Sequence, residues 1–277
     1  MRGCACRGTA GFAHVSCLAE QAKILVAEAE EDNLDEKVFI ERFGRWSACS
    51  LCEQDYHGVV RCALGWACWK TYVGRPEVAR VRQMAMNRLG SGLYQAGHYE
   101  EAASTREAEL AMLRRLGASE DDLLATHTNL ANTYAKLGRH ESALCTEREV
   151  YAGRMKLNGE EHRDTLMAAT NYAITLVEMQ RFEEVKSVLR KMMPVARRVL
   201  GENNGITLRM RWNYATALWM DAKATLDDLR AAVTMLEDIA RIMRRVFGIL
   251  HPHVVAIDNH LGLARKVLRA RETPPPR

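Results

Sequence analysis

The feature that most constrains the fold of this 277-residue chain is an internal repeat with a period of 42 residues. Asparagines recur in one column of the repeat, and alanines follow them two residues later: Asn129, Asn171 and Asn213, then Ala131, Ala173 and Ala215. Glycines recur with the same period at Gly117, Gly159 and Gly201, and the next glycine, Gly248, falls five residues late. We expect an insertion near residues 223–229 to cause this delay. A fixed period of this length is the signature of stacked units that share one continuous core.

Each repeat is expected to be a hairpin of two helices. Apolar residues recur at intervals of three and four, as in Leu130, Tyr134 and Leu137, which is typical of an amphipathic helix. The turn at Gly138 separates a first helix, roughly residues 121–137, from a second that ends before a glycine C-cap at residue 159. Small residues recur at one site of every first helix, where they would let the two helices approach closely: Gly90, Ala131, Ala173, Ala215 and Gly262.

The stretch Asn-Leu-Ala-Asn-Thr-Tyr-Ala-Lys-Leu-Gly-Arg-His-Glu-Ser-Ala at residues 129–143 resembles a tetratricopeptide repeat. The 42-residue spacing, with Gly-Glu-Glu-His-x-x-Thr-Leu at residues 159–166, is similar to the longer repeat of kinesin light chains. The likeness covers residues 79–270, or about 4.5 repeats. It implies a right-handed superhelix whose concave groove is lined by the first helices and receives extended peptide segments.

This resemblance also implies candidate partner-binding residues. The column Asn129, Asn171 and Asn213 matches positions where relatives place amides that hydrogen-bond a ligand backbone, since an amide supplies both donor and acceptor. The alternative is that these amides bond neighbouring helices and only hold the stack. Arg88 falls in the same column of the first repeat. It would favour an acidic partner unless it is an ordinary solvated surface charge.

Metal-type residues gather near the N-terminus. They are Cys4-x-Cys6, His14-x2-Cys17 and, after a helical spacer, Cys49-x2-Cys52. Thiolate and imidazole are good zinc ligands, so zinc is the expected cofactor. Seven of the eight cysteines precede residue 70, and no apolar signal segment comes before them. We therefore expect reduced, metal-bound thiols in a protein that is cytoplasmic or nuclear and not secreted.

With Trp46 three residues before Cys49, this cluster resembles the RING-CH class of zinc fingers over residues 4–56. The resemblance implies one complete structural site, made by Cys4, Cys6, Cys49 and Cys52. His14 and Cys17 would form half of a second site, because the first Cys-x2-Cys knuckle of the class is missing, as in an N-terminally truncated finger. Trp46 matches a residue that helps to recruit a ubiquitin-conjugating enzyme. Cys62 and Cys68 could substitute as ligands, although an amphipathic helix over residues 59–72 favours packing.

The expected fold is mainly α, a tetratricopeptide-repeat solenoid preceded by a small RING-CH-like zinc-binding module. The predicted parts are the module at 1–56, a connecting helix at 57–78, the repeats at 79–270 and a disordered tail at 271–277. Only six prolines and 6% aromatic residues suit a helical chain. The formal charge of +4 is spread along the sequence, which argues against nucleic acid. The apolar stretch at 59–69 is too short to span a bilayer, which needs about 20 residues.

Two functions compete. The first is a zinc-binding interaction scaffold whose repeat groove captures a peptide or partner protein. The second is a RING-CH-type ubiquitin ligase that uses the repeats to choose a substrate and engages a ubiquitin-conjugating enzyme. The sequence has no phosphate-binding glycine loop, nucleophile elbow or His-Glu-x2-His motif, so no catalytic residue is predicted. Ligase activity is expected only if the missing knuckle is supplied.

Overall fold

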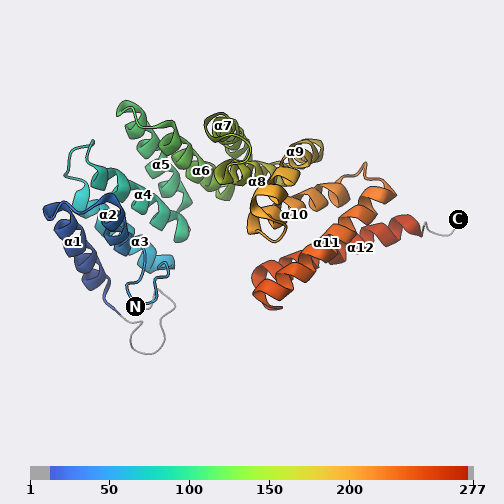
Figure 1. The fold of residues 1–277 in the computed structure, drawn as a ribbon, viewed down its shortest axis with the longest axis horizontal. Coiled ribbons are helices and arrows are strands. Elements are labelled where there is room, and N and C mark those ends of the chain that lie inside the picture. The colour runs from blue at the N-terminus through green and yellow to red at the C-terminus, as the bar shows by residue number, and fades with distance from the viewer. Residues whose placement is uncertain (1–12, 274–277) are drawn as a thin grey trace. The chain divides into compact units, whose positions relative to one another are not determined.

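A computed structural model describes residues 13–273, and this part of the chain is mainly helical (Figure 1). Its α-helices are α1 (Val15–Glu31), α2 (Glu36–Phe43), α3 (Gly58–Tyr72), α4 (Arg80–Gln95), α5 (Tyr99–Arg115), α6 (Glu120–Lys136), α7 (His140–Asn158), α8 (Arg163–Glu178), α9 (Phe182–Leu200), α10 (Gly205–Met220), α11 (Leu226–Phe247) and α12 (Pro252–Glu272), and a short 3-10 helix, η2, spans Gly44–Trp46. The chain divides into two compact units, of which the first ends at Arg139 and the second begins at His140. The mainly α architecture is confirmed.

The helix boundaries agree closely with the repeat pattern. The first and second helices predicted for the repeat around Asn129 are α6 and α7, and the turn residue Gly138 is left-handed with a φ of 72°. Gly159 after α7 is left-handed too, with a φ of 79°. His162 and His251 begin α8 and α12 as N-caps, because each side chain accepts a hydrogen bond from a backbone N–H two residues later. In sequence order, four helix pairs and the final helix α12 make about 4.5 repeats.

In the first unit, the backbones of α3 and α4 touch at two glycines. A Cβ atom added to Gly65 of α3 would lie 2.8 Å from the carbonyl oxygen of Arg88. One added to Gly92 of α4 would lie 2.9 Å from the carbonyl oxygen of Arg61. Both distances are shorter than carbon and oxygen tolerate, so any side chain at either position would push the helices apart. α3 is therefore more than a connector, since it packs directly on the first repeat.

The N-terminal helices share their core with this first repeat. Val26 of α1, Phe43 of α2, Trp46 of η2, Tyr72 of α3 and Val81 of α4 are all buried in one cluster. The ring centroids of Phe43 and Tyr72 lie 6.1 Å apart, and the rings of Trp46 and Tyr72 meet edge to face at 6.0 Å. Residues 13–56 thus obtain their core by packing on α3 and α4.

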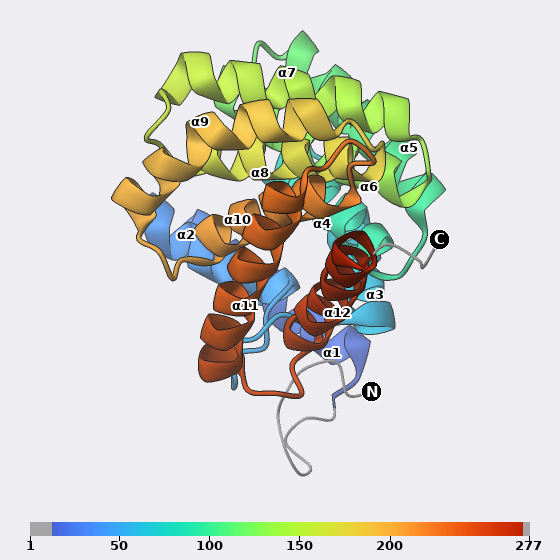
Figure 2. The ribbon, with the colours of Figure 1, turned by 90° about the vertical axis from the view of Figure 1, so that its right-hand side faces the viewer.

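The second unit contains α7 to α12. Each of these helices packs on the next, and α10 also contacts α8 and α12 (Figure 2). The first helices of three successive repeats therefore lie side by side. One core cluster includes the fully buried side chains of Leu166, Leu189 and Met192, and a second includes those of Leu236 and Ile257. The six helices bury a continuous apolar interior, as stacked hairpins must.

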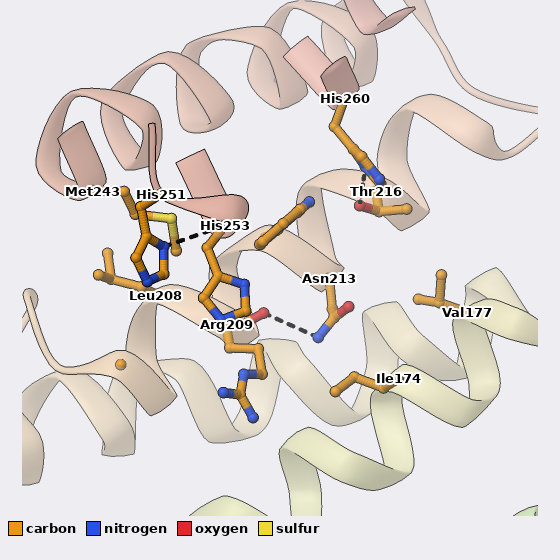
Figure 3. Close-up of a pocket in the computed structure, with 12 residues that line it drawn as sticks. Ile174, Val177, Leu208, Arg209, Asn213, Thr216, Met243, His251, His253 and His260 are labelled. Atoms are coloured by element: carbon orange, nitrogen blue, oxygen red, sulfur yellow. Dashed lines mark hydrogen bonds between the residues drawn. The ribbon is translucent and has the colours of Figure 1, made fainter. Parts of the chain in front are cut away.

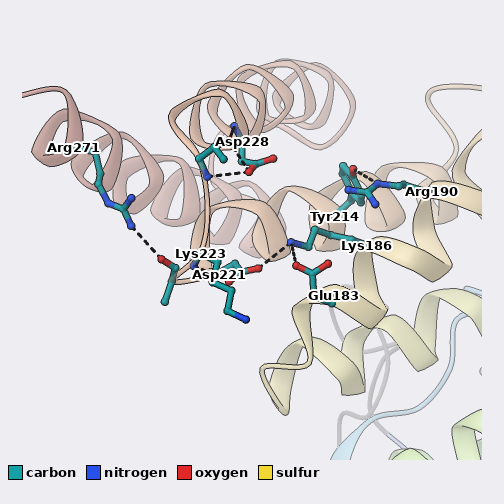
Figure 4. Close-up of polar contacts among 10 residues, drawn as sticks. Glu183, Lys186, Arg190, Tyr214, Asp221, Lys223, Asp228 and Arg271 are labelled. Carbon is teal, nitrogen blue, oxygen red and sulfur yellow. Dashed lines mark hydrogen bonds and ion pairs between the residues drawn. The ribbon is translucent and has the colours of Figure 1, made fainter.

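A buried ion pair holds the turn that carries the inserted residues, between α10 and α11. The ammonium group of Lys186 on α9, a residue that is only 8% exposed, lies 2.9 Å from Asp221 Oδ2 and 2.6 Å from Glu183 Oε1 (Figure 4). The hydrogen bond from Lys186 lowers the pKa of the Asp221 carboxyl. Thr225 and Asp228 then begin α11 with a reciprocal capping box. The ion pair stands where the first two repeats have a left-handed glycine, Gly97 or Gly138, and the third has the left-handed Gln180.

Helix packing explains why small residues are required at most positions of their column, but it does not explain all of them. Ala131, Ala173 and Ala215 are buried, as predicted. An added Cβ at Gly90 would lie 3.4 Å from the Arg106 side chain. At Gly262 it would meet nothing within 4 Å, so the expectation of a close helix approach is wrong there. The final helix α12 has no partner helix following it within residues 13–273 that could impose this constraint.

We predict that Gly92→Ala lowers the free energy of unfolding of the first unit by about 1–3 kcal/mol, because overpacking separates α3 from α4. The matched control is Gly262→Ala, which is also inside a helix but has open space around it. It should raise stability by about 1 kcal/mol, because alanine favours the helical backbone over glycine. Urea unfolding followed by circular dichroism measures both; a Gly92→Ala variant as stable as the parent would contradict the contact.

Candidate functional site

The second unit contains a cavity of about 570 Å³ on the side where α8, α10 and α12 lie next to one another (Figure 3). Its floor is apolar and includes Ile174, Val177, Leu208, Trp212 and Met243. Polar side chains surround this floor: Arg209, Asn213, Thr216, His251, His253 and His260. An apolar floor with a few polar groups at its edge is typical of a ligand-binding site.

Helical spacing brings these side chains to one face. Arg209, Asn213 and Thr216 are four and then three residues apart on α10, so they line up along the same side of that helix. Ile174 and Val177 are three residues apart on α8 and face the same cavity. The groove is thus built from one stripe of each first helix, as the repeat pattern requires. We call this site the α8–α10–α12 groove.

The column amides are half-buried and free to bond a ligand. Asn213 donates from Nδ2 to the backbone oxygen of Arg209 at 3.0 Å, within its own helix, and its Oδ1 is left as an acceptor (Figure 3). Asn171 on α8 is also half-buried, and so is Asn129 on α6 in the first unit. Among the described residues, no side-chain hydrogen bond joins a column amide to a neighbouring helix. This arrangement supports a ligand-facing role more than a purely structural one.

His260 is a groove residue that the sequence analysis missed. It lies one 42-residue period plus the five-residue insertion after Asn213, so it occupies the asparagine column of the fifth repeat. Its ring stands edge-on to Trp212 at 5.3 Å and to Trp219 at 6.1 Å, and Nδ1 lies 3.4 Å from Thr216 Oγ1. Burial lowers the pKa of His260, which favours the neutral imidazole. The register shift at Gly248 was the signal that could have identified it.

The groove is positive at its mouth. No carboxylate is among the side chains that line it, whereas Arg209 is exposed at its edge. Arg209 makes no ion pair within residues 13–273. Its charge is therefore available to a bound segment.

Trp46 and Arg88 were predicted to bind a partner, but the structure places both side chains elsewhere than on an open binding surface. Trp46 is only 1% exposed and lies in the core of the first unit, so its predicted docking role is corrected to a packing role. Arg88 lies half-buried with its guanidinium 5.9 Å from the centre of the Phe43 ring. Burial, followed by the nearby charge of Arg61, lowers the pKa of Arg88. Because α3 packs against this position, Arg88 neither lines a peptide groove nor is a solvated surface charge.

Cys49 and Cys52 lie in a tight hairpin, which we call the cysteine knuckle. The backbone N–H of Cys49 donates to the carbonyl of Gln54 at 2.9 Å, and that of Leu51 donates to the Cys49 sulfur at 3.4 Å. Glu53 turns the chain with a left-handed φ of 57°. An N–H directed at sulfur stabilises a thiolate, as a metal-bound cysteine requires. The donor set of the knuckle therefore fits zinc.

Two features anchor the knuckle to the rest of the first unit. Arg61 of α3 donates to the carbonyl of Ser47 at 2.8 Å and pairs with Asp55 at 3.0 Å. Cys49 packs in a buried cluster with Tyr56, Val60 and Leu64, and Cys52 contacts its edge. The two cysteines are thus held in place by α3.

Of the other predicted zinc ligands, the structure describes only His14 and Cys17. Cys4 and Cys6 lie outside the described residues. His14 Nδ1 and Cys17 Sγ are 3.9 Å apart at the exposed start of α1. Within residues 13–273, no three His, Cys, Asp or Glu side chains come together to hold a metal ion. Burial raises the pKa of Cys68, which is fully buried, and that of Cys62, so both thiols favour the protonated form and packing.

Comparisons with known proteins support the repeats. Residues 123–164 match the family model of the tetratricopeptide repeat. The crystal structure of BtubC (BKLC) from P. vanneervenii is 15% identical, covers 96% of each chain and has a TM-score of 0.57. A putative kinesin light chain of Podosopora anserina with nearly identical TPR-like repeats is 18% identical and has a TM-score of 0.55, over 85% of this chain and 99% of that chain. The crystal structure of a variant of that protein gives a TM-score of 0.56.

The family match confirms a tetratricopeptide repeat at residues 123–164, and the solved structures, at these identities, show a fold similar to that of kinesin-light-chain-like repeats and nothing further. No curated protein matches the chain. The family match does not reach residues 4–56, so the RING-CH likeness stays a prediction. No helix within the described residues is long and apolar enough to cross a bilayer.

We predict that His260 makes the second unit less stable in acid. Its pKa is below the usual 6.5 in the folded state, so the unfolded chain takes up the proton first as the pH falls. Stability should therefore decline below about pH 6.5 and level off once folded His260 is protonated as well. His260→Asn, which introduces the asparagine found at this column position in the preceding repeats, should remove the part of the acid-dependent loss of stability that is due to His260.

Urea unfolding at about pH 7.5 and about pH 5 measures the effect. The loss of unfolding free energy between the two pH values should be smaller in His260→Asn than in the parent protein. An equal loss in both proteins would show that His260 does not titrate in this way. His253→Asn, at an exposed histidine for which no such burial exists, is the control.

Proposed function

We propose that this protein is a binding scaffold that captures an extended segment of a partner protein in the α8–α10–α12 groove. The tetratricopeptide fold supports protein–protein interaction as the general role. The observation that carries the proposal is the apolar cavity bordered by the column amide of Asn213, which has no hydrogen-bond partner on a neighbouring helix within residues 13–273. Amides can bond the backbone of any segment, and the floor selects for apolar side chains.

The charge of the groove restricts which kinds of partner segment can bind in it. Arg209 at the mouth and the lack of a lining carboxylate disfavour a basic segment. We therefore expect a neutral or acidic segment with at least one large apolar side chain. Trp212 and Met243 offer a deformable aromatic and thioether surface for that side chain.

We predict that Asn171→Ala combined with Asn213→Ala weakens peptide capture. Peptides selected on the parent protein from a random display library should lose roughly tenfold in affinity, because two hydrogen bonds of about 0.5–1.5 kcal/mol each are removed. Fluorescence anisotropy with a labelled selected peptide measures the change. Asn203→Ala, at an exposed turn between α9 and α10, is the matched control and should bind normally. Unchanged affinity in the double variant would reject the groove assignment.

We further propose that Cys49 and Cys52 hold a structural zinc ion together with Cys4 and Cys6. The Leu51 N–H directed at the Cys49 sulfur supports this role, and the RING-CH likeness supplies the other two ligands. Four thiolates leave no open coordination position, so zinc would join the N-terminal segment to the cysteine knuckle and add folding free energy. His14 and Cys17 would contribute to a second site only with ligands from elsewhere.

Zinc content is the direct test. We predict that the purified protein contains zinc by mass spectrometry and that Cys49→Ser or Cys52→Ser loses it, because a missing thiolate opens the site. Cys145→Ser, at an exposed cysteine on α7, should retain the metal. Zinc-free parent protein, or equal metal content in all variants, would show that the knuckle is not a ligand pair.

A ubiquitin ligase is the second candidate function. One observation favours it, since Leu51 at the tip of the cysteine knuckle is 68% exposed and could contact a conjugating enzyme. The burial of Trp46 weighs against it. An autoubiquitination assay of the zinc-loaded protein separates the two functions, because only a ligase transfers ubiquitin. Transfer that is lost in Cys49→Ser would establish the ligase.

A further inference from the structure

The turn between α11 and α12 differs from its counterparts in the other repeats. After the capping glycine, the turn before α8 has Glu160 and Glu161, and the turn before α10 has Glu202 and Asn203. The turn before α12 has Ile249 and Leu250 instead, and these side chains are 71% and 88% exposed. Val246, in the last turn of α11, is 60% exposed as well. Two positions that are polar in the turns before α8 and α10 have thus become aliphatic without becoming buried.

The turn before α12 also differs from the turns before α8 and α10 in its charge. In the two earlier turns, acidic residues pair with the arginines in the last turn of α9: Arg197 lies 3.1 Å from Glu202 in the turn that follows it, and Arg198 lies 2.7 Å from Glu161 in the turn before α8. Residues 239–257 contain arginines and histidines but no Asp or Glu. Arg244 reaches Asp258 on α12, whereas Arg245 makes no ion pair within the described chain. The turn is both apolar and cationic.

We propose that this turn binds an anionic membrane surface. We define the α11–α12 tip as Arg245, Val246, Ile249 and Leu250. The aliphatic side chains would enter the interfacial region of the bilayer while Arg245 pairs with lipid phosphate or carboxylate groups. Apolar burial and attraction to anionic lipids are the two contributions that drive peripheral membrane binding.

The position of the tip favours a lipid surface over a protein partner. The turn lies at the end of the α11–α12 pair that points away from α8 and α9, so it protrudes instead of forming a groove (Figure 2). A protein would need a cavity matched to two adjacent aliphatic side chains, whereas a lipid interface deforms around them. A single tip of this size gives weak, reversible binding. The proposal does not depend on the peptide-binding function of the groove.

Vesicle co-sedimentation tests the proposal. The parent protein should sediment with mixed phosphatidylserine–phosphatidylcholine vesicles and much less with phosphatidylcholine alone. Ile249→Glu combined with Leu250→Glu should reduce the bound fraction roughly tenfold, because it removes the inserting side chains and adds negative charge. These substitutions introduce the residues that the turn before α8 already has, so the fold should tolerate them. Arg245→Gln should weaken binding to the anionic vesicles, and added salt should do the same.

A matched control uses another exposed aliphatic residue. Val78 in the first unit is 72% exposed, and Val78→Glu should leave vesicle binding unchanged. The double tip variant should also retain affinity for peptides selected on the groove, which separates this proposal from the peptide-binding function. Failure of the parent protein to bind anionic vesicles would overturn the proposal, as would equal binding by the double tip variant. Self-association or protein binding that depends on the tip, without vesicle binding, would assign it to a protein interface instead.

Discussion

The direct backbone contact between α3 and α4 is the constraint on which the first unit depends. Gly65 and Gly92 leave no side chain between the two helices, so their relative position is fixed by backbone atoms. The aromatic cluster around Tyr72 forms on one side of this contact, and it gives the N-terminal helices their core. Arg61, whose carbonyl meets Gly92, extends its side chain to the base of the cysteine knuckle. The position of the predicted zinc ligands is therefore decided by a helix contact outside the cysteine motif.

The second unit obtains its groove in a different way, by repetition. The same stripe of each first helix faces the same side, so a column of the sequence becomes a row of side chains. The insertion after α10 does not disturb this row, because the Lys186–Asp221 ion pair holds the altered turn and α12 still reaches its place beside α10. His260 consequently takes the position that asparagine has in the preceding repeats. The groove thus continues across the insertion, and its chemistry changes because the column residue of the last repeat is His260 instead of asparagine.

Local patterns predicted the helices well and individual side-chain roles less well. The turn glycines, the helix ends around Gly138 and Gly159 and the capping histidines follow from short-range backbone chemistry, and the structure agrees with each. Trp46 was assigned to a surface because a family motif suggested it, but it is buried in a cluster against helices that include α1 and α3. Burial depends on residues distant in sequence, which a motif does not report.

The sequence by itself determined that the chain consists of stacked helical hairpins, because period, apolar spacing and capping residues act within one or two turns of backbone. Only the tertiary structure decided which members of each column face a cavity and which are covered. Asn213 and Arg88 share a column, yet the first borders an open groove and the second lies against α3 over Phe43. The physical reason is that a repeat specifies the orientation of a side chain on its own helix, whereas its environment is set by whichever helix packs against that face.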